Sequence, residues 1–114
     1  MRIRLFSQTA IVGLLLCMTA GCDAVFHSAA LVEMKRKLAQ QVLATNRRGV
    51  ELVVGGAVKR GLPSIVYVSS LSVFFHPGCG PIGLEMPVVE GHTAYAKSKS
   101  EAEVAVRAMQ AAGA

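Results

Sequence analysis

The stretch that decides the fold is residues 64–70, SIVYVSS. Its centre is a continuous run of β-branched and aromatic residues, which is typical of a strand covered on both faces in a parallel sheet. The run closes on Ser69 and Ser70. In open α/β sheets, ligands bind at the carboxyl ends of the strands. The two serines are therefore expected where a site would lie, although serines are also common turn residues.

Upstream of this strand, the sequence predicts a strand followed by a long helix. Residues 23–27 (DAVFH) are short and apolar, and they run into a loop at Ser28. Residues 34–60 have a helical period, and Gly61 and Pro63 should end that helix. The apolar residues that recur at three- and four-residue steps are Leu38, Val42, Val50, Val53, Val54 and Ala57.

Downstream lie a long loop and a last helix. Residues 71–93 are rich in glycine and proline, and a loop of about 20 residues is too long for a simple connector, so we expect it to face a substrate. The last helix should run from about Thr93, a plausible N-cap, to Ala111, with Glu103 and Arg107 as a favourable ion pair and Gly113 as its stop.

The order strand, helix, strand, helix predicts an α/β fold, a βαβα unit of a doubly wound parallel sheet. Two strands alone do not make a stable sheet, so we expect a piece of a larger sheet, truncated at both ends. Exposed strand edges could then pair with another chain and give oligomers.

Residues 1–21 form an apolar segment that allows two interpretations. Arg2 and Arg4 precede an apolar run that is too short to span a bilayer but resembles a secretory or lipoprotein signal ending at Cys22. Alternatively, residues 10–20 form a helix of the domain that Gly21 ends, and the protein is cytoplasmic. A domain at residues 22–114 follows in either case.

Composition excludes several classes of protein. A hydrophobic content of 53% with 17% charged residues argues against disorder. The net charge of +5 comes from small basic clusters without interleaved aromatic residues, so a solvated helix face is favoured over nucleic-acid binding. The spacing of His76, Cys79 and His92 fits no common metal motif, and we expect no metal.

The sharpest chemical signal is Tyr95 with Lys99, four residues apart and therefore on one helix face. Ala102 and Val106 continue that face, so Lys99 should point partly inward. An ammonium beside a phenol favours the phenolate and lowers a pKa that is about 10 in water. The phenol then becomes a usable acid or base near neutral pH.

Asn46 lies between Val42 and Val50 on the apolar face of the long helix. A buried amide should be hydrogen-bonded. Its partner could be a neighbouring strand in a purely structural role, and that role is compatible with a place in a site.

In combination, these motifs resemble the extended short-chain dehydrogenase/reductase family. The motifs are HSAA at 27–30, NRRG at 46–49, VYVSS at 66–70, and Tyr95 with Lys99 after a loop rich in glycine and proline. The resemblance is to NAD-dependent epimerase/dehydratases and to their 3-beta-hydroxysteroid dehydrogenase and dihydroflavonol-reductase-like branches. It implies a partial Rossmann-type domain that binds NAD or NADP.

The resemblance also implies roles for individual residues. Ser70 would hydrogen-bond the reacting oxygen, Tyr95 would give or take its proton, and Lys99 would also bind the nicotinamide ribose. Asn46 would help fix the active-site helix. Residues 27–30, through His27, Ala29 and Ala30, would lie along the cofactor, with hydride passing between nicotinamide and a carbinol or carbonyl carbon.

One departure from the family pattern is large. The family begins with a strand and a GxxGxxG turn that holds the pyrophosphate, and this sequence has no such turn. The resemblance therefore implies a segment that is inactive alone. The resemblance implies a small carbonyl or alcohol compound or a sugar nucleotide as substrate, and the sequence does not choose among them.

Overall fold

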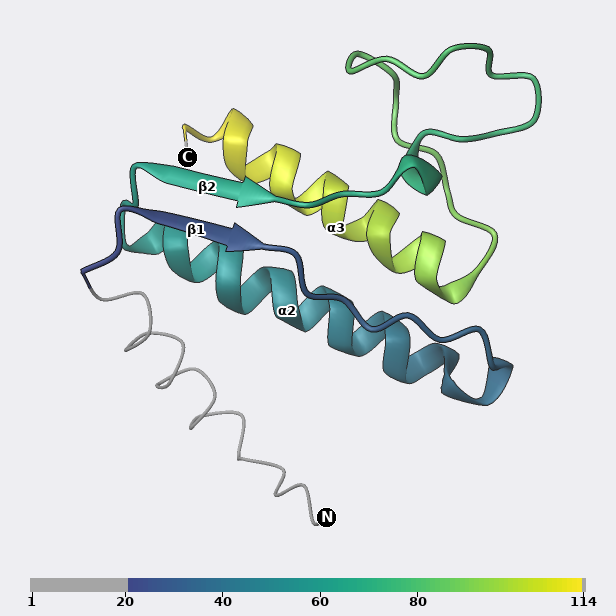
Figure 1. Ribbon diagram of the computed structural model, residues 1–114, viewed down its shortest axis with the longest axis horizontal. Helices are drawn as coiled ribbons and strands as arrows, with labels where there is room; N and C mark the ends of the chain where they lie inside the picture. Colours follow the sequence, from purple (N-terminus) through teal and green to yellow (C-terminus); the bar gives the residue numbers. More distant parts are fainter. Residues whose placement is uncertain (1–20, 114) are drawn as a thin grey trace.

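The computed structural model describes residues 21–113, in which two short parallel strands and two long helices alternate (Figure 1). Strand β1 (Ala24–His27) pairs in parallel with β2 (Ser64–Tyr67), and His27 lies opposite Tyr67. The amide of Val68 donates to the carbonyl oxygen of His27 at 3.0 Å, which extends the ladder past the end of β2. The predicted order of strands and helices is confirmed.

Helix α2 (Ala39–Lys59) begins later than the helix predicted for residues 34–60, and that predicted start was wrong. A short 3₁₀ helix, η1 (Arg36–Leu38), precedes it, and Lys35 is extended with ψ 124°. The carboxylate of Glu33 accepts hydrogen bonds from the amides of Met34 and Lys35, at 2.9 and 3.0 Å. These bonds hold the chain in a turn that the helical period of the sequence does not reveal.

The other predicted helix ends are confirmed. Gly61 has φ 67°, a left-handed conformation that closes the end of α2. Helix α3 (Ala94–Ala111) begins after Thr93, whose hydroxyl accepts from the amide of Ala96 at 3.1 Å. Along this helix, Arg107 and Glu103 form the expected ion pair at 2.8 Å.

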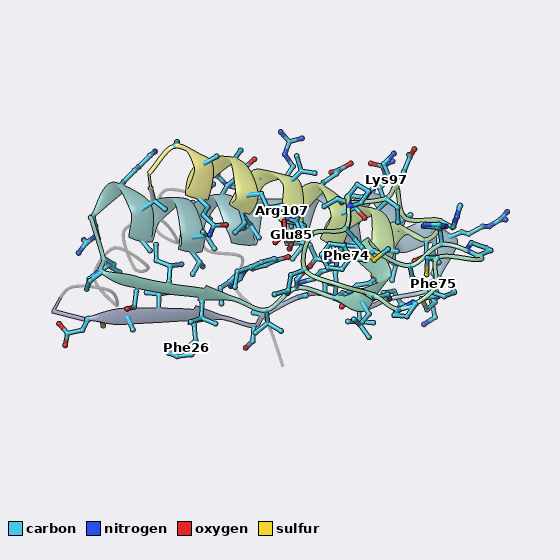
Figure 2. The ribbon with its side chains drawn as sticks, turned by 90° about the horizontal axis from the view of Figure 1, so that it is seen from above. Phe26, Phe74, Phe75, Glu85, Lys97 and Arg107 are labelled. Atoms are coloured by element: carbon cyan, nitrogen blue, oxygen red, sulfur yellow. The ribbon has the colours of Figure 1, made fainter. Side chains whose placement is uncertain are left out.

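Both helices lie side by side on one face of the sheet (Figures 1 and 2). The core between the layers is formed by Val50, Val54 and Ala102, with partly buried residues packed around it: Ile65, Tyr67, Val106 and Met109. Phe26, 73% exposed, points away from the helices in Figure 2. The expectation that β2 is covered on both faces was therefore wrong for the described part of the chain, because both helices pack on the same side.

The segment between β2 and α3 is held at both of its ends, and its middle projects away from the sheet and helices (Figure 1). It opens with a second 3₁₀ helix, η2 (Leu71–Val73), which the sequence did not indicate. The amide of Val89 donates to the carbonyl oxygen of Val73 at 2.8 Å, and the hydroxyl of Ser100 donates to the carbonyl oxygen of Val89 at 2.7 Å. Both ends of the segment are thus tied to α3.

The predictions for residues 10–20, whether helix or signal, lie outside the described residues. Within residues 21–113, no helix has the length and apolar character needed to cross a bilayer. Over the same range, no group of three or more histidine, cysteine or acidic side chains is placed to hold a metal ion.

Candidate active site

Lys99 is buried at the carboxyl end of β2, with only 4% of its surface exposed. Its ammonium donates to the carbonyl oxygen of Val68 at 2.6 Å and lies 4.4 Å from the centre of the Tyr67 ring. Burial lowers the pKa of Lys99, while the negative charge of Glu103 acts in the opposite direction. The predicted inward position of Lys99 is confirmed.

Tyr95 lies one helical turn before Lys99, at the start of α3, and is partly exposed. Its carbonyl oxygen accepts a hydrogen bond from the Ser98 hydroxyl at 2.7 Å. Among residues 21–113, no group hydrogen-bonds to the phenol oxygen of Tyr95. The two side chains therefore share a region of α3 as expected, but the ammonium of Lys99 binds the end of β2 and not the phenol.

Ser69 and Ser70 come just after β2, separated from it by Val68, and their hydroxyls differ in their hydrogen bonds. The Ser70 hydroxyl caps η2: it accepts from the amide of Ser72 at 3.3 Å and lies 2.9 Å from the Ser72 hydroxyl oxygen. The hydroxyl oxygen of Ser69 is buried and has no partner within the described chain. A hydroxyl offers one donor and two acceptor positions, so both serines keep hydrogen-bonding capacity at this sheet edge.

Asn46 is 5% exposed and joins three segments that are distant in sequence. Its side-chain oxygen accepts from the amide of Leu31 at 2.6 Å. Its amide nitrogen donates to the carbonyl oxygen of Leu31 at 3.0 Å and to the Ser98 hydroxyl at 2.9 Å. Ser98 in turn donates to the carbonyl oxygen of Tyr95, so one buried amide links α2, the loop after β1 and the first turns of α3.

The expectation that Asn46 is buried and paired is confirmed, but its partners are a loop and a helix, not a neighbouring strand. Sequence reasoning missed Ser98, which is fully buried. The available signal was a small polar residue three positions after Tyr95, on the side of α3 that packs against α2.

His27 is buried with 6% exposure and does not lie open in the loop after β1. Its ring stacks on that of Tyr67, with centroids 5.9 Å apart, and a Cβ added at Gly49 would lie in ordinary contact with the imidazole, at 3.6 Å. Burial lowers the pKa of His27, and the positive charge of Lys99 lowers it further. Ala29 and Ala30, by contrast, are exposed.

Sequence reasoning also missed Tyr67, which it treated only as a strand residue. Its ring lies in contact with both the His27 ring and the ammonium of Lys99. The phenol oxygen is buried without a partner in residues 21–113, and burial raises the pKa of Tyr67 to about 12. The sequence did contain an indication: Tyr67 is two residues after Ile65, and alternate residues of a strand face the same side of the sheet.

These residues fit one end of a dinucleotide and not the other. An orphaned buried hydroxyl at Ser69, a buried ammonium at Lys99 and the small exposed side chains of Ala29 and Ala30 lie around the carboxyl edge of the sheet. Ribose hydroxyls could hydrogen-bond there. In Rossmann-type folds a glycine-rich turn at a helix N-terminus binds the pyrophosphate, and residues 21–113 contain no such turn.

Comparison with known proteins decides the family. The chain matches the 3-beta hydroxysteroid dehydrogenase/isomerase family over residues 15–113, from within the apolar segment almost to the end. The chain belongs to this family. The predicted membership among NAD-dependent epimerases and dehydratases is thereby confirmed. No curated protein matches the chain.

Solved structures confirm the Rossmann-type fold class for this 3-beta hydroxysteroid dehydrogenase/isomerase family member. A dTDP-glucose 4,6-dehydratase from Streptomyces venezuelae, solved with NAD, is 29% identical, with TM-score 0.77 over 90% of this chain and 32% of its own. The enzyme WbmH of Bordetella bronchiseptica, solved with NAD+, is 26% identical, with TM-score 0.73 over 90% of this chain and 35% of its own.

A UDP-glucose 4-epimerase from Bifidobacterium longum, at 24% identity and TM-score 0.75, shares the fold over 90% of this chain and 32% of its own. The chain thus spans about a third of the length of the solved structures that it matches.

Proposed function

We propose that this chain carries the proton-transfer residues of an NAD-dependent oxidoreductase or epimerase of the short-chain dehydrogenase/reductase type. The observation that carries the proposal is the buried ammonium of Lys99, bonded to the end of β2 next to Ser69 and Ser70 and one helical turn after Tyr95. A buried cation needs a compensating role, and the carboxyl edge of a parallel sheet is where α/β proteins bind ligands.

In this proposal, the hydroxyls of Tyr95 and Ser70 act at the reacting oxygen of the substrate. The phenol of Tyr95 gives a proton to a carbonyl oxygen, or as phenolate takes one from a carbinol, and the Ser70 hydroxyl hydrogen-bonds the same oxygen. Bound NAD or NADP would supply or accept the hydride at the adjacent carbon. Asn46 is a positioning residue, because its bonds to Ser98 and Leu31 hold the turn that carries Tyr95 beside the loop after β1.

The ammonium of Lys99 and the loop of Ala29 and Ala30 would hold the nicotinamide ribose. His27 would support this loop from the protein interior, since its buried ring lies beside Gly49 and stacks on Tyr67. We propose a small carbonyl, alcohol or sugar-nucleotide substrate; the dehydratase and epimerase among the solved relatives are named for nucleotide sugars. We also propose a cytoplasmic location. Attachment of lipid to Cys22 in cells would contradict it and indicate that the protein is exported.

The test separates the two ends of the cofactor. The ¹⁵N-labelled chain is titrated with nicotinamide mononucleotide and, separately, with AMP, and amide shifts are recorded. The proposal predicts that the nicotinamide nucleotide moves the signals of Ser69, Ser70, Lys99 and the loop after β1, while AMP leaves them in place. Equal responses to both nucleotides, or shifts confined to other surfaces, would contradict a nicotinamide-ribose site.

A further inference from the structure

The ring of Tyr67 stacks on the imidazole of His27, with centroids 5.9 Å apart, and its centre lies 4.4 Å from the ammonium of Lys99. We propose that Tyr67 is a positioning residue, whose ring face holds the ammonium of Lys99 charged and in place at the carboxyl end of β2. The relevance of this role to catalysis rests on the proposed function. The interaction itself can be measured without it.

Few groups compensate the burial of Lys99, and the Tyr67 ring is one that is in direct contact with its ammonium. An ammonium has three N–H donors, and one hydrogen bond is formed, to the carbonyl oxygen of Val68. Within residues 21–113, no carboxylate forms an ion pair with Lys99, and the carboxylate of Glu103 binds Arg107 at 2.8 Å. A cation over an aromatic face is stabilised most strongly where both are shielded from water.

The titratable groups around Lys99 come from three elements. His27 lies on β1 and stacks on the Tyr67 ring, Tyr67 lies on β2, and Glu103 and Tyr95 lie one turn away on α3. Burial lowers the pKa of His27, which favours its neutral form, so it adds little repulsion. Glu103 favours the charged form of Lys99 from a distance, and the aromatic face does so in direct contact.

The ring of Tyr67, and not its hydroxyl, makes the contact with Lys99. The phenol oxygen is buried without a hydrogen-bond partner among the described residues, and the raised pKa of Tyr67, about 12, keeps it protonated. Removing the hydroxyl should therefore leave Lys99 unaffected. Removing the ring should not, and this difference supplies a matched pair of variants.

The experiment follows the protonation of Lys99 in the full chain by NMR of ¹³C- and ¹⁵N-labelled lysine side chains, with Lys99→Met to assign the signal. Tyr67→Phe should titrate as the unsubstituted chain does. Tyr67→Leu should lower the pKa of Lys99 by about one unit, since a desolvated contact of this kind is worth that much or more. The proposal would be overturned if the pKa of Lys99 in Tyr67→Leu equalled that in the unsubstituted chain. It would also be overturned if Tyr67→Phe lowered the pKa of Lys99 as much as Tyr67→Leu does.

A second measurement covers the case in which Tyr67→Leu fails to fold. Phenylalanines carrying one, two and three fluorine atoms are incorporated at position 67, which preserves the shape of the ring while withdrawing electrons from its face. The pKa of Lys99 should fall with each added fluorine, and no trend would overturn the proposal. Binding of nicotinamide mononucleotide is scored separately, so its failure counts against the proposed function alone.

Discussion

Replacing Asn46 with alanine should remove the link between the loop after β1 and the turn of α3 that carries Tyr95. The side chain makes three hydrogen bonds, of 2.6, 3.0 and 2.9 Å, and is 5% exposed. At about 1 kcal/mol net for each bond, their loss costs about 3 kcal/mol. Alanine is the better helix former by roughly 0.5 kcal/mol, so the expected loss of unfolding free energy is about 2.5 kcal/mol.

The assay is urea unfolding followed by far-UV circular dichroism, with Gln41→Ala as the matched control. Gln41 is exposed on the same helix, and its replacement should change the unfolding free energy by less than about 0.5 kcal/mol. Thermal unfolding of Asn46→Ala should shift down by about 10 °C or more. In hydrogen exchange, the Leu31 amide should lose protection. A loss equal to that of the control, or a Leu31 amide that stays protected, would refute the reasoning.

Two further predictions concern the packing around the site. Gly91→Ala should destabilise the fold by about 2 kcal/mol or more in urea unfolding, because an added Cβ would collide with the backbone of the first turn of α3. Gly83→Ala, where nothing in the described chain lies within 4 Å, should be nearly neutral, and equal losses would contradict the predicted collision. The pKa of His27 lies below its ordinary 6.5, so below about pH 6.5 the unfolded chain binds a proton that the folded chain resists. The free energy of unfolding should therefore decrease as the pH drops below 6.5. His27→Gln should reduce this decrease, while His76→Gln, which replaces an exposed side chain, should leave it unchanged. A decrease that persists in His27→Gln would show that other groups cause it.

The elements of the fold follow from local patterns, and these were readable in the sequence. The β-branched run before Ser69 predicted β2, the period of apolar residues predicted α2, and the N-cap at Thr93 with the Glu103–Arg107 pair predicted α3. The start of α2 was misplaced because it depends on the side chain of Glu33 bonding to the next two amides. Coverage of the sheet was also misjudged, because the sequence of β2 does not say on which side the helices pack.

The site was predictable in its residue types and less so in its contacts. The burial of Lys99 follows from its place on the face that holds Ala102, and the need of Asn46 for a partner follows from its apolar surroundings. The partners themselves are 15 and 52 residues away, so only the folded chain identifies them. The contact of Lys99 with Tyr67 is equally non-local, since α3 and β2 meet only after folding.

The most direct test of the central claim, a nicotinamide-ribose site built around Lys99, is to repeat the nicotinamide mononucleotide titration on two lysine variants. Lys99→Met removes the buried ammonium, and Lys97→Met removes an exposed one two residues away on the same helix. The account predicts that the shifts of Ser69 and Ser70 disappear in Lys99→Met and persist in Lys97→Met. Shifts that survive in Lys99→Met, or that disappear in both variants, would contradict it.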